Sequence, residues 1–444
     1  MAKRVKKIQD YSWWYSTLRH YVDLTLKLSY RNIRYVGLEK IPQNSAIIYA
    51  PNHTNALMDA LVILTMDRKP KVFVARADIF KKPILARIFH FLKIMPIMRM
   101  RDGMDEVRKN NETIEKAVDV LRDNVPFCIF PEGQHQAKYS SLPLSKGIFR
   151  IAFQAQELMP DTPLYIVPVG MRYGSFFRFR STVRVQIGDP INVGEFMDQN
   201  SEMTPQEQMN VMREILAERM RSSIFYIEND ENYDATYEVC AAAVKTQARK
   251  LYKTHPSLRE NRLDAHFKAN NITVQQISQM REERPEDYAH LMKLGHEAYA
   301  IRKSKRISIN SISIKYPVLS RVLKHLYLIL ALPYCIPVSI LTLPIKLLCG
   351  FIFTKLKDYA FRNSIRYLLN LLLWPVLMVI YSIIICIFLP LPWSVAAIAL
   401  LLPAPIVAHE TWRLIRLLIS DVRLFLNKDL RGKYRQMKAI LFKK

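Results

Sequence analysis

The chain has 444 residues, half of them hydrophobic, and a formal net charge of +26 at pH 7. This length leaves room for a catalytic domain and at least one further unit. The positive charge calls for an anionic partner, but the sequence lacks zinc-finger spacing and RNA-binding aromatic motifs, and its basic residues lie beside long apolar runs. These features argue against a nucleic-acid binder and favour an anionic membrane surface.

The N-terminal segment begins with basic residues but lacks the apolar stretch of a secretory signal peptide. From Tyr11 a helical pattern runs to Leu26 and includes Trp13 and Trp14. Trp and Tyr favour the membrane–water boundary, so we interpret residues 1–30 as an N-terminal interfacial helix. The alternative is a helix that packs on the following domain.

Residues 31–200 alternate short, branched apolar runs with segments of helical length near 59–66, 83–92, 111–122 and 147–158. The predicted strands are Ile33–Val36, Ala46–Tyr49, Val72–Val74, Ile94–Met98, Phe127–Phe130, Leu164–Val169 and Val183–Ile187. This order predicts an α/β domain with a mostly buried mixed sheet of about seven strands flanked by helices.

A histidine and a carboxylate lie where the second predicted strand meets a helix. His53 and Asp59 belong to the stretch Pro51–Asp59, and α/β proteins bind ligands at the carboxyl ends of their strands. In such a pair the imidazole takes a proton from a hydroxyl while the carboxylate keeps the other ring nitrogen protonated. Because residues six apart do not share a helix face, His53 is expected in the turn before the helix. For an isolated pair, a loop histidine and a helix-capping aspartate would explain the same residues.

Basic side chains follow two further predicted elements. Arg99 and Arg101 come just after the fourth strand, and alternate residues of an extended segment share a face, so both guanidinium groups are candidates for one phosphate. Lys146 opens a predicted helix, where the helix dipole already favours anions. The alternative is that they are solvated charges of a basic chain.

Four stretches, in this order and at this spacing, resemble the motifs of the glycerolipid (PlsC-like) acyltransferase family over roughly residues 30–200. They are Pro51–Asp59, Ile94–Gly103, Phe130–Gly133 and Ile166–Gly170. The family transfers a fatty acyl group from a thioester to glycerol 3-phosphate, lysophosphatidate or a related lysolipid. Its motif usually has four residues between His and Asp, whereas this chain has five. The longer spacing is similar to that of the fungal-type glycerol-3-phosphate/dihydroxyacetone-phosphate acyltransferases.

The resemblance implies that His53 is the catalytic base, that Asp59 orients it, and that Arg99, with Arg101, binds the acceptor phosphate. It implies that Glu132 and Gly133 help to bind the glycerol-phosphate end.

Pro131 fixes φ and Gly133 permits a backbone conformation that other residues resist, so a tight turn orients Glu132. Glu132 would accept hydrogen bonds from acceptor hydroxyls or brace an arginine. The turn at residues 53–56 is the expected source of amides for the oxyanion. The family has no equivalent of His135, which we interpret as a bystander.

The rest of the chain changes character. Residues 201–324 are charged and helical in pattern, and we interpret them as a helical extension. Residues 325–410 hold long apolar runs, predicted to form hydrophobic membrane hairpins, of which the first, interrupted by prolines, need not cross. Residues 411–444 form a basic amphipathic tail, with ten Lys and Arg against two acids. Basic flanks prefer the cytoplasm, so we expect an integral membrane protein with its catalytic domain on the cytoplasmic face.

The leading hypothesis is an enzyme that acylates glycerol 3-phosphate or dihydroxyacetone phosphate, with acyl-CoA or acyl-carrier protein as co-substrate. It requires no cofactor, and the five cysteines lack the spacing of metal ligands or of a disulfide framework, so no metal is predicted. The same motifs allow a lysophosphatidate acyltransferase. A different class is a non-catalytic membrane protein that binds lipids. Membrane lipids are the expected partners, and the sequence leaves the oligomeric state open.

Overall fold

The computed structural model describes residues 7–97, 110–312, 317–356 and 358–443. Arg99 and Arg101 therefore lie outside the described residues. The chain divides into two compact units, each considered by itself. The first comprises Met1–Ile224 together with Lys357–Ser364, and the second comprises Phe225–Leu356 and Ile365–Lys444.

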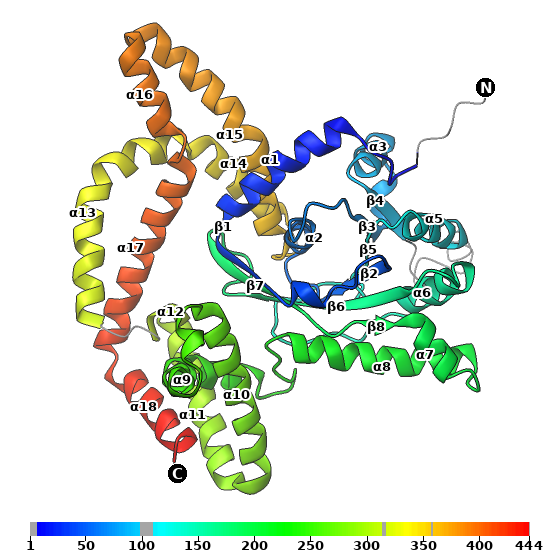
Figure 1. The fold of residues 1–444 in the computed structure, drawn as a ribbon. Helices are drawn as coiled ribbons and strands as arrows, with labels where there is room; N and C mark the ends of the chain where they lie inside the picture. Colours follow the sequence, from blue (N-terminus) through cyan, green and yellow to red (C-terminus); the bar gives the residue numbers. More distant parts are fainter. Residues whose placement is uncertain (1–6, 98–109, 313–316, 357, 444) are drawn as a thin grey trace. The chain divides into compact units, whose positions relative to one another are not determined.

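The first unit contains a mixed sheet (Figure 1). Its strands are β1 (Tyr30–Val36), β2 (Ala46–Pro51), β3 (Val72–Arg76), β4 (Ile94–Ile97), β5 (Phe127–Cys128), β6 (Leu164–Tyr173), β7 (Ser181–Ile187) and β8 (Ile191–Asn192). The order is β1-β7-β6-β2-β5-β3-β4, and β8 pairs with β6. Strands β7 and β8 run antiparallel to β6, and the other pairs are parallel. The predicted mixed sheet is confirmed; β8, with two residues, is too short to give a sequence pattern.

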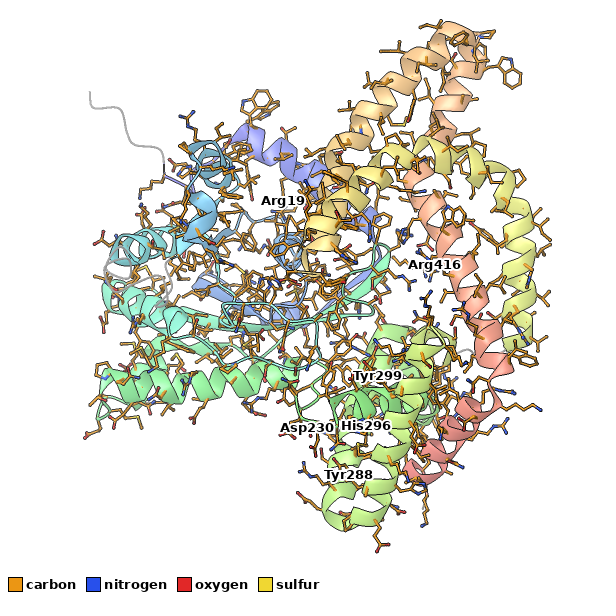
Figure 2. The ribbon with its side chains drawn as sticks, turned by 180° about the vertical axis from the view of Figure 1, so that it is seen from behind. Arg19, Asp230, Tyr288, His296, Tyr299 and Arg416 are labelled. Carbon is orange, nitrogen blue, oxygen red and sulfur yellow. The ribbon has the colours of Figure 1, made fainter. Side chains whose placement is uncertain are left out.

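Helices cover both sides of the sheet. They are α1 (Trp13–Ser29), α2 (Leu57–Leu64), α3 (Pro83–Phe91), α5 (Asn110–Arg122), α6 (Gly147–Leu158), α7 (Val193–Gln199) and α8 (Pro205–Ser223). Figure 1 shows α1 and α2 on one side of the sheet and α6 and α8 on the other. The helix α1 is attached to the end of α2 by Arg19 (labelled in Figure 2), whose guanidinium donates to the carbonyls of Leu64 and, at 2.8 Å, of Asp67.

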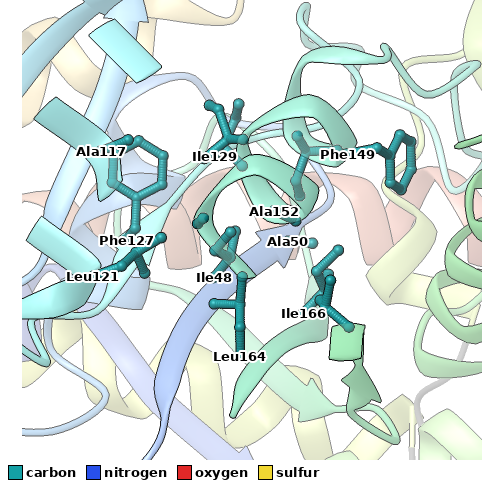
Figure 3. Close-up of a cluster of buried hydrophobic side chains, with 14 of the residues drawn as sticks. Ile48, Ala50, Ala117, Leu121, Phe127, Ile129, Phe149, Ala152, Leu164 and Ile166 are labelled. Carbon is teal, nitrogen blue, oxygen red and sulfur yellow. The ribbon is translucent and has the colours of Figure 1, made fainter. Parts of the chain in front are cut away.

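The main core lies between the sheet and the helices α5, α6 and α8. Figure 3 shows Ile48 of β2 and Leu164 of β6 beside Phe127, with Leu121 of α5 and Ala152 of α6 completing the cluster. All five are fully or almost fully buried. Side chains alternate between the two faces of a strand. The residues of β2 that fill this core therefore alternate with residues that face α2.

The helix α8 belongs to the first unit, although we had assigned its residues to the extension. It begins with a capping box, in which Thr204 and Glu207 hydrogen-bond each other's backbone amides. It ends against β6, where a Cβ on Gly170 would lie 2.2 Å from the carbonyl oxygen of Ser223. Glycine is therefore required for this close approach.

The second unit begins with four helices, α9 (Tyr233–Thr254), α10 (Arg262–Glu283), α11 (Pro285–Ser304) and the four-residue α12 (Ile309–Ile312). Figure 2 labels Tyr288, His296 and Tyr299, which all belong to α11. The C-terminal helix α18 (Lys428–Leu441) packs on α9 and α11. At their junction the buried carboxylate of Glu238 accepts from Arg302 at 2.8 Å and from the Tyr434 hydroxyl at 2.5 Å. The basic tail thus helps to build the helical extension.

The long apolar helices are α13 (Pro317–Leu341), α14 (Leu343–Lys355), α15 (Phe361–Phe388), α16 (Leu391–Leu401) and α17 (Ala404–Leu426). In the described part of the chain, two stretches are long and apolar enough to cross a membrane, Val318–Leu341 and Phe361–Phe388. A third would result if α16 and α17, which meet at a 50° bend, formed one span. The predicted hydrophobic character of this region is confirmed, whereas its topology stays a prediction.

Candidate active site

The turn between β2 and α2 carries the candidate catalytic residues. Asn52 attaches the end of β2 to β6: its amide donates to Val169 O at 3.2 Å, and its side chain exchanges two hydrogen bonds with the backbone of Met171. Ala56, just before α2, has φ 47°, a conformation that costs a non-glycine residue energy. The turn is therefore held by its contacts with β6 and by Asp59.

His53 and Asp59 meet in this turn. The Nδ1 of His53 lies 2.8 Å from Oδ2 of Asp59, which is fully buried in the first turn of α2. The same oxygen accepts from the amides of Thr54 and Asn55, each at 2.7 Å. The extra residue between His and Asp is thus accommodated in the turn, as we expected from the spacing.

This geometry assigns the ring nitrogens of His53. An ionised carboxylate only accepts hydrogen bonds, so Nδ1 carries the proton and Nε2 keeps its lone pair. The His53 side chain is 18% exposed and therefore remains accessible. The pair has the arrangement required of a general base and the group that orients it.

Two of the four amides in the turn at residues 53–56, where we expected donors for the oxyanion, are already used. Those of Thr54 and Asn55 both donate to Asp59. They orient the carboxylate and are not available to a tetrahedral intermediate.

The loop after β5 lies directly against His53. The ring of Phe130 stacks on the imidazole with a centroid distance of 4.2 Å. Gly133 has φ 63°, which confirms the tight turn, and its amide donates to Phe130 O at 3.0 Å. The amide of Gln136 donates to His53 O at 3.1 Å. The two motifs predicted to cooperate are therefore in contact.

Glu132 is buried beside the pair, with only 5% of its surface exposed. Neither carboxyl oxygen has a hydrogen-bond partner among the described residues. Burial raises the pKa of Glu132 to about 8; the nearby backbone amides of His53 and Leu142 act in the opposite direction, and Asp59 adds to the rise. An acceptor hydroxyl or an arginine would each give this carboxyl a partner.

Two side chains that the sequence did not single out also contact the pair. The hydroxyl of Tyr173, at the end of β6, donates to Oδ1 of Asp59 at 2.7 Å. Burial raises the pKa of Tyr173, so its hydroxyl stays protonated and acts as the donor. His135, which we interpreted as a bystander, lies edge-on to His53 at a centroid distance of 5.3 Å. Its Nε2 lies 2.7 Å from Oδ2 of Asp358, three residues before the start of α15.

Of the three predicted phosphate-binding residues, only Lys146 is among the described residues. Arg99 and Arg101 lie outside the described residues. Lys146 is half-buried at the start of α6, next to Gly147. A Cβ on Gly147 would lie 3.9 Å from Ile97, the last residue of β4, so this helix begins beside the strand that leads to the arginines. Across the described ranges, no cluster of three His, Cys, Asp or Glu residues is suited to a metal ion.

Comparison with known proteins finds relatives of the domain that carries these residues. The acyltransferase family matches residues 32–172. Glycerol-3-phosphate O-acyltransferase 2 of Saccharomyces cerevisiae is 25% identical over 303 residues, which are 63% of this chain and 38% of the yeast protein. A 1-acyl-sn-glycerol-3-phosphate acyltransferase of Borreliella burgdorferi is 24% identical over 148 residues, 33% of this chain and 57% of that protein.

Among solved structures, the 1-acyl-sn-glycerophosphate acyltransferase PlsC of Thermotoga maritima is 20% identical, with a TM-score of 0.33; the match covers 46% of this chain and 78% of that one. The chain spans well under half the length of its yeast relative. The family match includes β2, the His53–Asp59 turn and the Glu132 loop. This part of the chain, residues 32–172, is a domain of the acyltransferase family.

Proposed function

We propose that the chain is a membrane-bound O-acyltransferase that transfers a fatty acyl group from a thioester to a hydroxyl of glycerol 3-phosphate or dihydroxyacetone phosphate. The observation that carries this proposal is the 2.8 Å contact between His53 Nδ1 and Asp59 Oδ2, which leaves Nε2 as a base. The acyltransferase-family domain and the similarity to a yeast glycerol-3-phosphate O-acyltransferase support it.

In the proposed reaction, Nε2 of His53 takes the hydroxyl proton as the hydroxyl oxygen bonds to the thioester carbonyl carbon. The tetrahedral intermediate then breaks its C–S bond, and the proton passes from the imidazolium to the thiolate. Asp59 stabilises the imidazolium. This chemistry needs no redox cofactor, and its acyl donor is the thioester of coenzyme A or of acyl-carrier protein.

The acceptor phosphate would be bound by Arg99, Arg101 and Lys146, and Glu132 would contact the polar end of the acceptor. Phosphate suits planar guanidinium groups, which present paired donors. The runner-up acceptor is lysophosphatidate, which the similarity to the Borreliella burgdorferi protein supports. It has the same phosphate with one acyl chain already attached, so the predicted contacts do not separate the two.

Two regions support a membrane location. The stretches Val318–Leu341 and Phe361–Phe388 are long and apolar enough to span. In the first unit, α1 buries Tyr15 and Leu26 and exposes Trp13 and Trp14. The helix thus packs on the domain and also presents aromatic rings of the type found at membrane surfaces. The basic flanks of the apolar segments place the catalytic unit on the cytoplasmic side in this proposal.

The test uses the full chain purified in detergent, with a labelled acyl-CoA and, side by side, glycerol 3-phosphate, dihydroxyacetone phosphate and lysophosphatidate. Wild-type protein should acylate glycerol 3-phosphate or dihydroxyacetone phosphate faster than lysophosphatidate. His53→Ala should lower the rate by about 10²–10⁴-fold, the usual contribution of a general base. The matched control is His290→Ala, which removes an exposed histidine of α11.

If His53→Ala keeps the wild-type rate, the catalytic mechanism is refuted and a lipid-binding protein becomes the better description. A preference for lysophosphatidate would establish the runner-up acceptor and leave the role of His53 intact.

A further inference from the structure

The segment that links the apolar helix α14 to α15, together with the first four residues of α15, belongs to the first unit. We call its described residues, 358–364, the connector. Ala360, Asn363 and Ser364 in the connector are each at most 3% exposed. A short segment between two apolar helices, the second of them long enough to span a membrane, would ordinarily lie in solvent or among lipid head groups. Here these three residues are buried in the unit that contains the acyltransferase-family domain, whereas Asp358 and Phe361 remain exposed.

One end of the connector reaches the catalytic histidine through His135. The carboxylate of Asp358 lies 2.7 Å from Nε2 of His135, and the ring of Phe361 lies edge-on to the same imidazole at 5.3 Å. The other side of His135 faces the ring of His53, also at 5.3 Å. The next residue, Gln136, hydrogen-bonds the backbone of His53. Fixing His135 therefore fixes both the ring and the main chain of the base.

The opposite end of the connector approaches the catalytic carboxylate indirectly, through two tyrosines. Asn363 is a polar neighbour of the buried Tyr30 hydroxyl, as is Tyr173. The rings of Tyr30 and Tyr173 lie 6.1 Å apart, and Tyr173 donates to Asp59. Two separate series of side-chain contacts thus link the connector to His53 and to Asp59.

The ordinary explanation is that Asp358 merely stabilises the fold. Its side chain is 49% exposed, and such a pair typically contributes only about 0–1 kcal/mol to stability. A contact that contributes little to stability can still have a large effect on rate, because a base displaced by about 1 Å loses up to about 10²-fold in rate. The contact is thus weak as a fold stabiliser but well placed to orient His53.

We propose that Asp358 and His135 are positioning residues for His53, so that the connector completes the acyltransferase site. This inference rests on the proposed function, since it assigns these residues to the same reaction. It makes the geometry of the base depend on the segment that joins the two apolar helices.

The first experiment compares His135→Ala, Asp358→Ala and the double variant in the full chain, with kcat and KM measured for both substrates. Each single variant should lower kcat by about tenfold with KM unchanged, because positioning acts on the chemical step. The double variant should lose no more than either single one, because the residues act along one route. Asp358→Asn keeps an oxygen that accepts from His135 and should recover most of the lost kcat.

Hydrogen exchange gives a readout besides activity. Peptides from residues 130–136 should exchange faster in Asp358→Ala, because His135 loses its anchor. The matched control is Asp189→Ala, which breaks a surface ion pair with Lys40 in the same unit and should change neither kcat nor exchange at 130–136.

The proposal is overturned if Asp358→Ala and His135→Ala keep the wild-type kcat while His53→Ala is inactive. It is also overturned if the loss appears in KM alone, or if Asp358→Asn loses as much kcat as Asp358→Ala. An inactive wild-type protein would instead refute the proposed function itself.

Discussion

Two His–Asp pairs lie next to each other in the first unit, and they are held in different ways. In the His53–Asp59 pair the carboxylate is fully buried and receives four hydrogen bonds, from the imidazole, two backbone amides and the Tyr173 hydroxyl. In the His135–Asp358 pair the carboxylate is half exposed, and the partners are 223 positions apart in the chain.

The two carboxylates therefore orient their histidines differently: Asp59 holds His53 rigidly, whereas the contact of Asp358 with His135 is adjustable. A buried carboxylate whose two oxygens both accept hydrogen bonds from the protein fixes its histidine without help from solvent. A half-exposed ion pair is weakened by water and salt and depends on how the connector is placed. In the proposed mechanism the first pair carries the proton chemistry, and the second pair adjusts the position of the first.

The largest expected effect comes from neutralising the buried pair. Asp59→Asn should lower kcat by about 10²–10⁴-fold, because the amide can no longer stabilise the imidazolium or select the Nδ1–H tautomer. Asp358→Asn should change kcat far less, because it keeps an acceptor for His135. Parallel kcat measurements on the two variants check the contrast. Equal losses would mean that both carboxylates act in the same way.

The sequence was sufficient to predict the local pair and the mixed sheet. His53 and Asp59 lie on either side of a strand–helix junction, and short, branched apolar runs identify the strands around them. It did not indicate the roles of His135 and Tyr173. Their partners, Asp358 and Asp59, are 223 and 114 positions away, and contacts over such distances leave no periodic pattern. The use of the Thr54 and Asn55 amides by Asp59 likewise depends on the turn geometry at Ala56.

A buried carboxylate outside the site tests whether the kinetic effects are specific. Glu238 pairs with the buried Arg302 in the second unit. Glu238→Ala leaves that arginine buried without its carboxylate and should destabilise the protein by about 3–5 kcal/mol. Thermal unfolding of the detergent-solubilised protein measures the loss. At temperatures where the variant remains folded, kcat should match the wild type; a lower kcat would show that the second unit influences the site.

Glu132 adds a third carboxyl group to the comparison and predicts a pH dependence of stability. Its pKa is raised from 4.5 to about 8 in the folded protein, so the folded state binds the proton more tightly than the unfolded state. Its favourable contribution is therefore complete below pH 4.5 and is lost as the pH rises to 8. Glu132→Gln removes this titration, so the stability of the wild type relative to the variant should decline across that window. Chemical unfolding at several pH values measures it; a constant difference would mean that Glu132 is ionised in the folded protein.

The smallest expected effect concerns the hydroxyl that joins Tyr173 to Asp59. Tyr173→Phe keeps the ring and removes one of the four hydrogen bonds to the carboxylate, at a cost of about 1 kcal/mol in unfolding free energy. The three remaining bonds still hold Asp59 against His53, so kcat should fall by much less than in Asp59→Asn. Denaturant unfolding and steady-state kinetics of the same preparation test both parts. A loss of kcat as large as that of Asp59→Asn would show that the hydroxyl, and not the backbone amides, orients the carboxylate.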